Sequence, residues 1–218
     1  MNYRLSLVTA PTVEPLLLRE VKDHLRIPHD THAEDAQLWI YMRAAREYIE
    51  GKYGIAGVVL ATQTWDLILD QFPASDQITI PLYPLQQASS LKYTDSANLE
   101  TTWAASNYTV DLDSEPGRIV LTYQNTWPSA TLAPMNPIKV RFIAGYDPAG
   151  NVIPASPAIT TRRKRLPETL KAALLLLVGH FYENREETTN ENTAISRRLA
   201  LGVDALVAGH TRPERYAV

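Results

Sequence analysis

The spacing of apolar residues changes twice along this chain of 218 residues. Residues 16–53 hold two apolar runs at helical intervals, first Leu17, Val21 and Leu25, and then Leu38, Met42, Ala45 and Ile49. From about residue 57 the period becomes two, which is the period of a half-buried strand. Helical spacing returns at Pro167. The pattern predicts helices, then strands, then helices.

The strand-like segments are short and are separated by turn residues. They cover residues 62–70, 107–113, 118–123 and 138–146. Between two of them, "DSEPG" supplies a Pro-Gly pair that favours reversal of the chain. Several short strands joined by turns predict an antiparallel sandwich or a small barrel.

The simplest architecture is an α+β fold with one helical bundle formed by both chain ends and an inserted antiparallel β-sandwich or barrel-like module. The predicted domains are residues 1–56 for the first half of the bundle, 57–147 for the β module, 148–165 for a linker, and 166–218 for the second half of the bundle with a C-terminal arm. The basic run from Arg162 to Arg165 ends the Pro-rich linker. A solvated linker is the favoured interpretation of this run, and a contact with DNA or an acidic protein surface is the alternative.

Residues 166–186, "LPETLKAALLLLVGHFYENRE", are the most hydrophobic stretch of the chain. Leu170, Leu174, Leu177 and Phe181 fall on one stripe of a helix over residues 167–187. A membrane-spanning helix needs about 20 mostly apolar residues, and the run between Lys171 and Glu183 is shorter than that. We therefore expect a core or interface helix and no membrane association. The N-terminus lacks the pattern of a secretory signal, so we expect the protein to be made and kept in the cytoplasm.

Composition and motifs argue against enzyme and metal chemistry. The chain has no cysteine, no glycine-rich phosphate loop and no nucleophile elbow. His24, His29 and His32 cluster with acidic residues and are the one candidate for a metal-dependent enzyme. Pro28 interrupts the helical register between them, and an exposed loop between two helices explains the cluster equally well. We expect no enzyme, no cofactor and no metal site.

Two tryptophans in polar segments, Trp103 and Trp127, motivate an alternative function. Exposed aromatic rings can act as platforms for sugar rings. The alternative is therefore a β-sandwich module that binds carbohydrate or a host surface and is carried on a helical oligomerisation domain.

Seven segments taken together give a more specific indication. In order they are "LREVKDHLRI", "AAREYIEGKYG", "IPLYPLQQASSLKYTDS", "NYTVDLDSEPGRIVL", "IKVRFIAGY", "LPETLKAALLLLVGHFYENRE" and "GVDALVA". Their order and spacing resemble the head-tail connector, or adaptor, proteins of long-tailed bacteriophages and related gene-transfer particles. The resemblance implies a structural virion protein, without catalysis, that forms a ring joining the capsid portal to the tail and lets the genome pass through.

The resemblance also implies the partners of the protein. They are further copies of the chain in a ring that is a dodecamer on the virion, the portal protein, and a tail-side neck or tail-terminator protein. DNA would be met only in transit, and the protein, made in the bacterial host cytoplasm, would lie at the neck between capsid and tail. With 21 Lys and Arg residues against 24 Asp and Glu residues, the net charge of −3 suits a conduit to which DNA does not adhere.

Two sets of residues are the candidates for these contacts. The helix over residues 167–187 is apolar around more of its circumference than one small bundle needs, so its surplus should face a neighbouring subunit or the other half of the bundle. The predicted subunit interface consists of Leu175, Leu176 and Val178. The predicted arm that docks on the portal consists of Val203, Leu206, Val207, Arg212, Arg215 and Tyr216.

Overall fold

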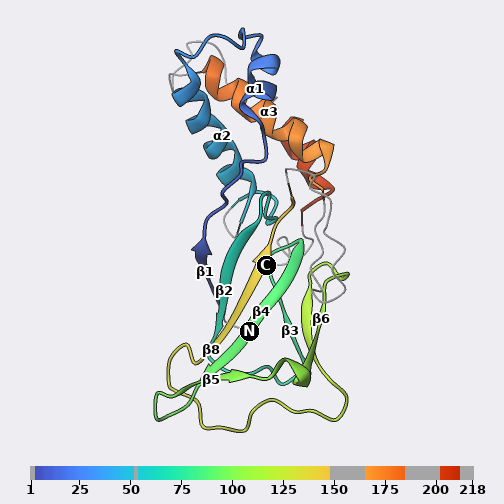
Figure 1. The fold of residues 1–218 in the computed structure, drawn as a ribbon. Coiled ribbons are helices and arrows are strands. Elements are labelled where there is room, and N and C mark those ends of the chain that lie inside the picture. The colour runs from blue at the N-terminus through green and yellow to red at the C-terminus, as the bar shows by residue number, and fades with distance from the viewer. Residues whose placement is uncertain (1–2, 52–53, 148–164, 185–201, 212–218) are drawn as a thin grey trace. The chain divides into compact units, whose positions relative to one another are not determined.

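The computed structural model describes residues 3–51, 54–147, 165–184 and 202–211, which form two compact units (Figure 1). One unit, called the β unit below, holds the described residues 3–12 and 61–147. The other, called the helical unit, holds the described residues 13–60 and those from residue 165 onward. The helical unit is thus assembled from segments on both sides of residues 61–147 in the sequence.

The β unit contains two antiparallel sheets. The first has the strand order β1 (Tyr3–Thr9), β2 (Gln63–Leu69), β8 (Ile138–Ala144), β4 (Leu85–Thr94) and β5 (Glu100–Trp103). The second has the order β3 (Gln77–Thr79), β7 (Arg118–Leu121) and β6 (Tyr108–Asp111), with the short 3-10 helix η1 (Ala105–Asn107) before β6. Neither sheet closes on itself through the described strands.

Alternation along β8 shows why these residues form a sheet with one buried face. Ile138, Val140 and Phe142 are fully buried, and Val140 and Phe142 lie opposite Leu67 and Trp65 of β2. Arg141, on the other face, donates two hydrogen bonds of 2.9 Å to the carboxylate of its cross-strand partner on β2, Asp66. The apolar face forms the core, and the paired charges lie on the opposite face.

Glycine is required at the end of β8. Gly145 has a positive φ of 124°, which L-residues rarely adopt, and a Cβ atom there would collide with the backbone of Ala61. The Gly145 carbonyl also accepts a 2.7 Å hydrogen bond from the buried side chain of Gln86. The "AGY" of the sequence therefore marks a close approach between two backbone segments.

The helical unit contains α1 (Leu18–Leu25), α2 (Asp35–Ile49), α3 (Glu168–Glu183) and a further helix over residues 202–208. α1, α2 and α3 contact one another. Two of the three stripes predicted from the sequence lie in the core: Leu38, Met42, Ala45 and Ile49 on α2 are buried, and on α3 Leu170, Leu174 and Leu177 are buried and Phe181 is half-buried. The third differs, because only Val21 of Leu17, Val21 and Leu25 is buried, and Leu17, which precedes α1, is 58% exposed. Hydrophobic burial along these stripes holds the unit together.

The α+β class and the antiparallel sheets agree with the sequence analysis. Strands β3, β4 and β5 were not among the predicted segments, and two boundaries also differ. Residues 1–56 were assigned to the helical half, whereas Tyr3–Thr9 forms the edge strand β1, which pairs with β2. The expected helix over residues 167–187 ends at Glu183 within the described residues. The expected linker, residues 148–165, lies outside the described residues except for Arg165, whose guanidinium donates a 2.9 Å hydrogen bond to Glu168.

Candidate functional site

Helix α3 is the centre of the helical unit. Gly179 lies against the imidazole of His24 on α1, where an added Cβ would be 3.3 Å from that ring. Lys171 pairs with Glu20 of α1, and the Tyr182 hydroxyl donates a 2.6 Å hydrogen bond to Glu34. Contacts with α1 and α2 therefore cover much of the apolar circumference of α3.

The three interface candidates on α3 occupy different environments. Val178 is fully buried inside its own unit, next to the core residues of the stripe. Leu175 and Leu176 are half-buried. Of the three, Leu175 and Leu176 thus retain surface that a neighbouring molecule can reach, and the interface role of the set stays a prediction.

The candidate arm is divided between described and undescribed residues. Val203 and Val207 are buried within the helical unit and Leu206 is half-buried. Thr169 of α3 and His210 form a 2.8 Å hydrogen bond. Arg212, Arg215 and Tyr216 lie outside the described residues, as do the candidate basic residues Arg162, Arg163 and Lys164.

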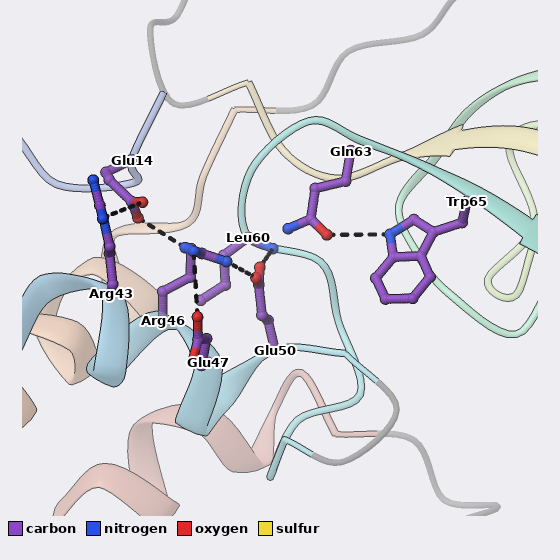
Figure 2. A network of polar contacts seen from close by, with 8 residues as sticks. All are labelled: Glu14, Arg43, Arg46, Glu47, Glu50, Leu60, Gln63 and Trp65. Atoms are coloured by element: carbon purple, nitrogen blue, oxygen red, sulfur yellow. Dashed lines mark hydrogen bonds and ion pairs between the residues drawn. The ribbon is translucent and has the colours of Figure 1, made fainter. Parts of the chain in front are cut away.

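A buried arginine organises one side of α2 (Figure 2). Arg46 donates a 2.8 Å hydrogen bond to Glu14, in the segment before α1, and another to Glu50, at the end of α2. Glu50 in turn accepts a 3.0 Å hydrogen bond from the backbone amide of Leu60. Burial alone would lower the pKa of Arg46, but the charges and hydrogen bonds of Glu50 and Glu14 outweigh it and raise the pKa.

Glu20 is a second ionised group that depends on its partners. Burial raises the pKa of its carboxyl group, but hydrogen bonds from Lys171 and from the Leu17 amide, with the nearby positive charges, outweigh that effect. The pKa of Glu20 is therefore below its ordinary value. This pair links α1 to α3, so the carboxylate form of Glu20 stabilises the contact between the two helices.

The histidine cluster does not converge on one point. His29 contacts Asp23 at 2.6 Å and His32 contacts Asp35 at 2.9 Å, while His24 faces Gly179 of α3. Within the described ranges, no three His, Asp or Glu residues are arranged to hold a metal ion. His29 and His32 thus contact carboxylates of the α1 to α2 region, and His24 lies against α3.

Trp103 and Trp127 belong to an aromatic cluster within the β unit. Trp127 stacks on Phe72 with 5.2 Å between ring centroids, and Trp103 stacks on Tyr108 at 5.7 Å. The two tryptophans lie 5.4 Å apart, and the indole N–H of Trp127 donates to the carbonyl of Ser75. Both rings are half-buried against other rings, so they do not form the open platform that a sugar-binding site requires.

The helical unit exposes a set of apolar residues that were not predicted from the sequence. Among its described residues, the large hydrophobic side chains with the highest exposure are Val13, Leu17, Trp39, Ile40 and Tyr48. Three of them lie on α2, outside its buried stripe. The signal was present in the sequence, because α2 carries more apolar residues than one stripe accounts for.

No described helix is both long and apolar enough to pass through a lipid bilayer.

A family model described as "Phage gp6-like head-tail connector protein" matches residues 16–113. The matched range begins just before α1, includes α2, and extends into the β unit past β6. No curated protein sequence matches the chain.

Solved structures match over nearly the whole chain. A chain of the "Neck of empty GTA particle computed with C6 symmetry" is 28% identical, with a TM-score of 0.68 and coverage of 95% of both chains. A chain of the "Virion of native gene transfer agent (GTA) particle" is 27% identical, with a TM-score of 0.68. A third, from the "Neck of native GTA particle computed with C12 symmetry", is 26% identical, with a TM-score of 0.69. The last two matches each cover 95% of this chain and 94% of the other.

These matches confirm the resemblance that the seven sequence segments indicated. The protein is similar to the phage gp6-like head-tail connector proteins over residues 16–113, and to chains of gene transfer agent necks over nearly its whole length.

Proposed function

We propose that this chain is the subunit of a ring that joins the capsid portal to the tail of a phage-like particle and lets the genome pass through. One observation carries the proposal: a likeness over 95% of the chain to a subunit of gene transfer agent necks, at 28% identity. In this role the helical unit is the bundle that builds the ring, and the β unit is a sandwich-like module that it carries.

The proposed ring is a dodecamer on the virion. The C6 and C12 symmetries named for the related necks support a closed ring with this number of subunits. A closed ring uses heterologous contacts, in which one patch of each subunit meets a different patch of its neighbour. We propose that Leu175 and Leu176 contribute to this packing, with Val178 supporting α3 from within the subunit.

The proposed partners are the portal on one side and a tail-side neck or tail-terminator protein on the other. The C-terminal arm would dock on the portal, and the net charge of −3 would keep DNA contacts weak during passage. The chain would be made in the host cytoplasm and would function at the neck. The proposed role is structural and needs no catalytic residue. His29 and His32, which were considered for catalysis, contact Asp23 and Asp35, and His24 lies against Gly179.

Removing residues 209–218 tests the docking of the arm. Val203 and Val207, which are buried in the helical unit, remain in the truncated chain, so the subunit should stay folded. The truncated protein should fail to join portal-bearing capsids, measured by co-sedimentation. Binding equal to that of the full chain would show that the arm does not dock.

Deleting the gene and restoring it in trans tests the function as a whole. Without the protein, filled capsids and tails should accumulate separately, and supplying the full chain should restore joined particles seen by electron microscopy. Complete, infective or gene-transferring particles made in the absence of the protein would contradict the proposal.

A further inference from the structure

Helix α2 carries a second apolar stripe on the side away from its core. Ala36, Ile40, Ala44 and Tyr48 follow one another at intervals of four residues. Ile40 is 58% exposed and Tyr48 is 49% exposed. Residues at this spacing form a continuous ridge on a helix, which is the shape that packs into a groove of another helix or segment. We call this surface the α2 ridge.

The α2 ridge is directed away from the helical core. Ile40 lies two positions after the core residue Leu38, and Ala44 lies two positions after the core residue Met42. Residues two positions apart on an α-helix point in directions roughly 200° apart. The ridge at Ile40 therefore lies well away from the buried stripe, and Tyr48, three positions after the core residue Ala45, lies closer to it. Ile40 and Tyr48 therefore expose apolar surface that the subunit itself does not cover, which is typical of a contact surface for another macromolecule.

A second apolar group lies on another side of α2. Val13 is 48% exposed and Leu17 is 58% exposed, in the segment that leads into α1. Glu14 fixes this segment to α2 through its hydrogen bond with Arg46. Arg46 is two positions from both Ala44 and Tyr48, so the anchoring point is roughly opposite the α2 ridge. The helical unit thus has two different exposed apolar groups, one on α2 and one in the segment before α1 that Glu14 anchors on the roughly opposite side of α2.

Two different patches on opposite sides are what a heterologous ring contact requires. Exposed charges lie beside both groups: Arg43 and Glu47, whose side chains are 63% and 71% exposed, flank the α2 ridge, and Arg19 lies two positions after Leu17. Opposite charges at the rim favour docking in one direction around the ring.

Resting on the ring function proposed above, we infer that the α2 ridge of one copy packs against Val13 and Leu17 of the next copy. The contact is made by a second copy of this chain, and it runs in the same direction from each subunit to the next. Apolar side chains at its centre exclude water, and Glu47 and Arg19 set its orientation at the rim.

Site-specific cross-linking tests the inference directly, because the natural chain contains no cysteine. Ile40→Cys and Leu17→Cys are each introduced alone and together, and a short thiol-reactive cross-linker is applied to neck rings assembled from the full-length protein. Mixed single variants should give a cross-linked dimer, and the double variant should give a ladder of larger species. Each single variant alone should give neither. Homotypic dimers from Ile40→Cys alone, or intact rings without the mixed dimer, would overturn the inference.

Charge substitution supplies a second readout. Ile40→Glu would bury a carboxylate at the contact and should lower the yield of rings by at least about tenfold, as should Leu17→Glu. Met135→Glu, at an exposed apolar residue of the β unit, is the matched control and should leave ring yield unchanged. Thermal unfolding of each variant verifies that the subunit is folded.

The outcomes separate this inference from the ring function. Normal ring yield with Ile40→Glu overturns the contact and leaves the ring function standing. Absence of the wild-type protein from particle necks overturns the ring function itself.

Discussion

The guanidinium group of Arg46 donates a 2.8 Å hydrogen bond to Glu14, which lies 32 positions earlier in the sequence. Through the same guanidinium group, the segment before α1 is linked to Glu50 and hence to the backbone of Leu60. One side chain therefore holds together the beginning and the end of the first helical segment.

Replacing Arg46 with methionine should destabilise the helical unit strongly. The carboxylates of Glu14 and Glu50, whose side chains are 12% and 8% exposed, would lose their buried partner. Breaking such a pair from one side costs about 3 kcal/mol or more of unfolding free energy. Urea unfolding monitored by circular dichroism measures the change.

Arg43→Met is the matched control for this prediction. Arg43 also lies near Glu14, at 3.8 Å, but its side chain is 63% exposed. Its loss should therefore change the unfolding free energy by less than about 0.5 kcal/mol. Equal effects of the two substitutions would contradict the role assigned to Arg46.

The Glu20 to Lys171 pair should give stability that depends on pH. A carboxyl group whose pKa is lower in the folded than in the unfolded state stabilises the protein above its unfolded pKa, and that stabilisation is lost as the pH falls through the folded pKa. At pH 7, Glu20→Gln should therefore lower the thermal midpoint of the helical unit. The difference from the wild type should shrink as the pH falls below 4.5, the ordinary value for this group.

Glu183→Gln removes an exposed carboxylate from α3 and serves as the control for the loss of one charge. A Glu20→Gln difference that stays constant from pH 7 to acid would show that the pair with Lys171 does not stabilise the fold.

Substitution of Gly145 by alanine should disrupt the β unit. The residue has a positive φ of 124°, and the added Cβ would collide with the backbone of Ala61, which cannot move as a flexible side chain can. We expect a loss of more than about 2 kcal/mol in unfolding free energy. Gly202→Ala is the control, because nothing lies within 4 Å of a Cβ added there. Wild-type stability of Gly145→Ala would show that the close approach is absent in solution.

Trp127 should behave as a structural residue. Trp127→Ala removes its stacking on Phe72 and its hydrogen bond to Ser75, and should cost about 2 kcal/mol, less than a fully buried tryptophan. Tyr123→Ala, at a side chain that is 92% exposed, should cost less than about 0.5 kcal/mol. A glycan screen should find no selective ligand. Selective binding that Trp127→Ala abolishes without loss of stability would restore the carbohydrate-binding alternative.

The sequence was sufficient for the features that depend on local periodicity. The stripes of α2 and α3 and the strands around Leu67, Val110 and Val140 follow from repeats that a short window contains. The edge strand β1 did not follow, because Val8 breaks the alternation of its short segment and its partner β2 is more than fifty residues away.

The surfaces were harder to predict than the elements. Residues off a stripe are seen in the sequence, but which neighbour covers them is decided by packing between distant segments. Thus Val178, expected at an interface, is buried in its own unit, whereas Ile40, which was not selected, is exposed. Trp103 and Trp127 were interpreted as packing residues, with an exposed platform as the alternative, and they pack on one another; the sequence did not indicate this partner, since the contact joins segments that the local pattern does not connect.

The most direct test of the account is a cryo-electron microscopy reconstruction of the neck of particles that carry this protein, with and without its gene. The account predicts a ring of twelve copies of this chain between portal and tail, present only when the gene is present. A neck whose rings contain no copy of this chain, in particles that are complete and joined to tails, would contradict it.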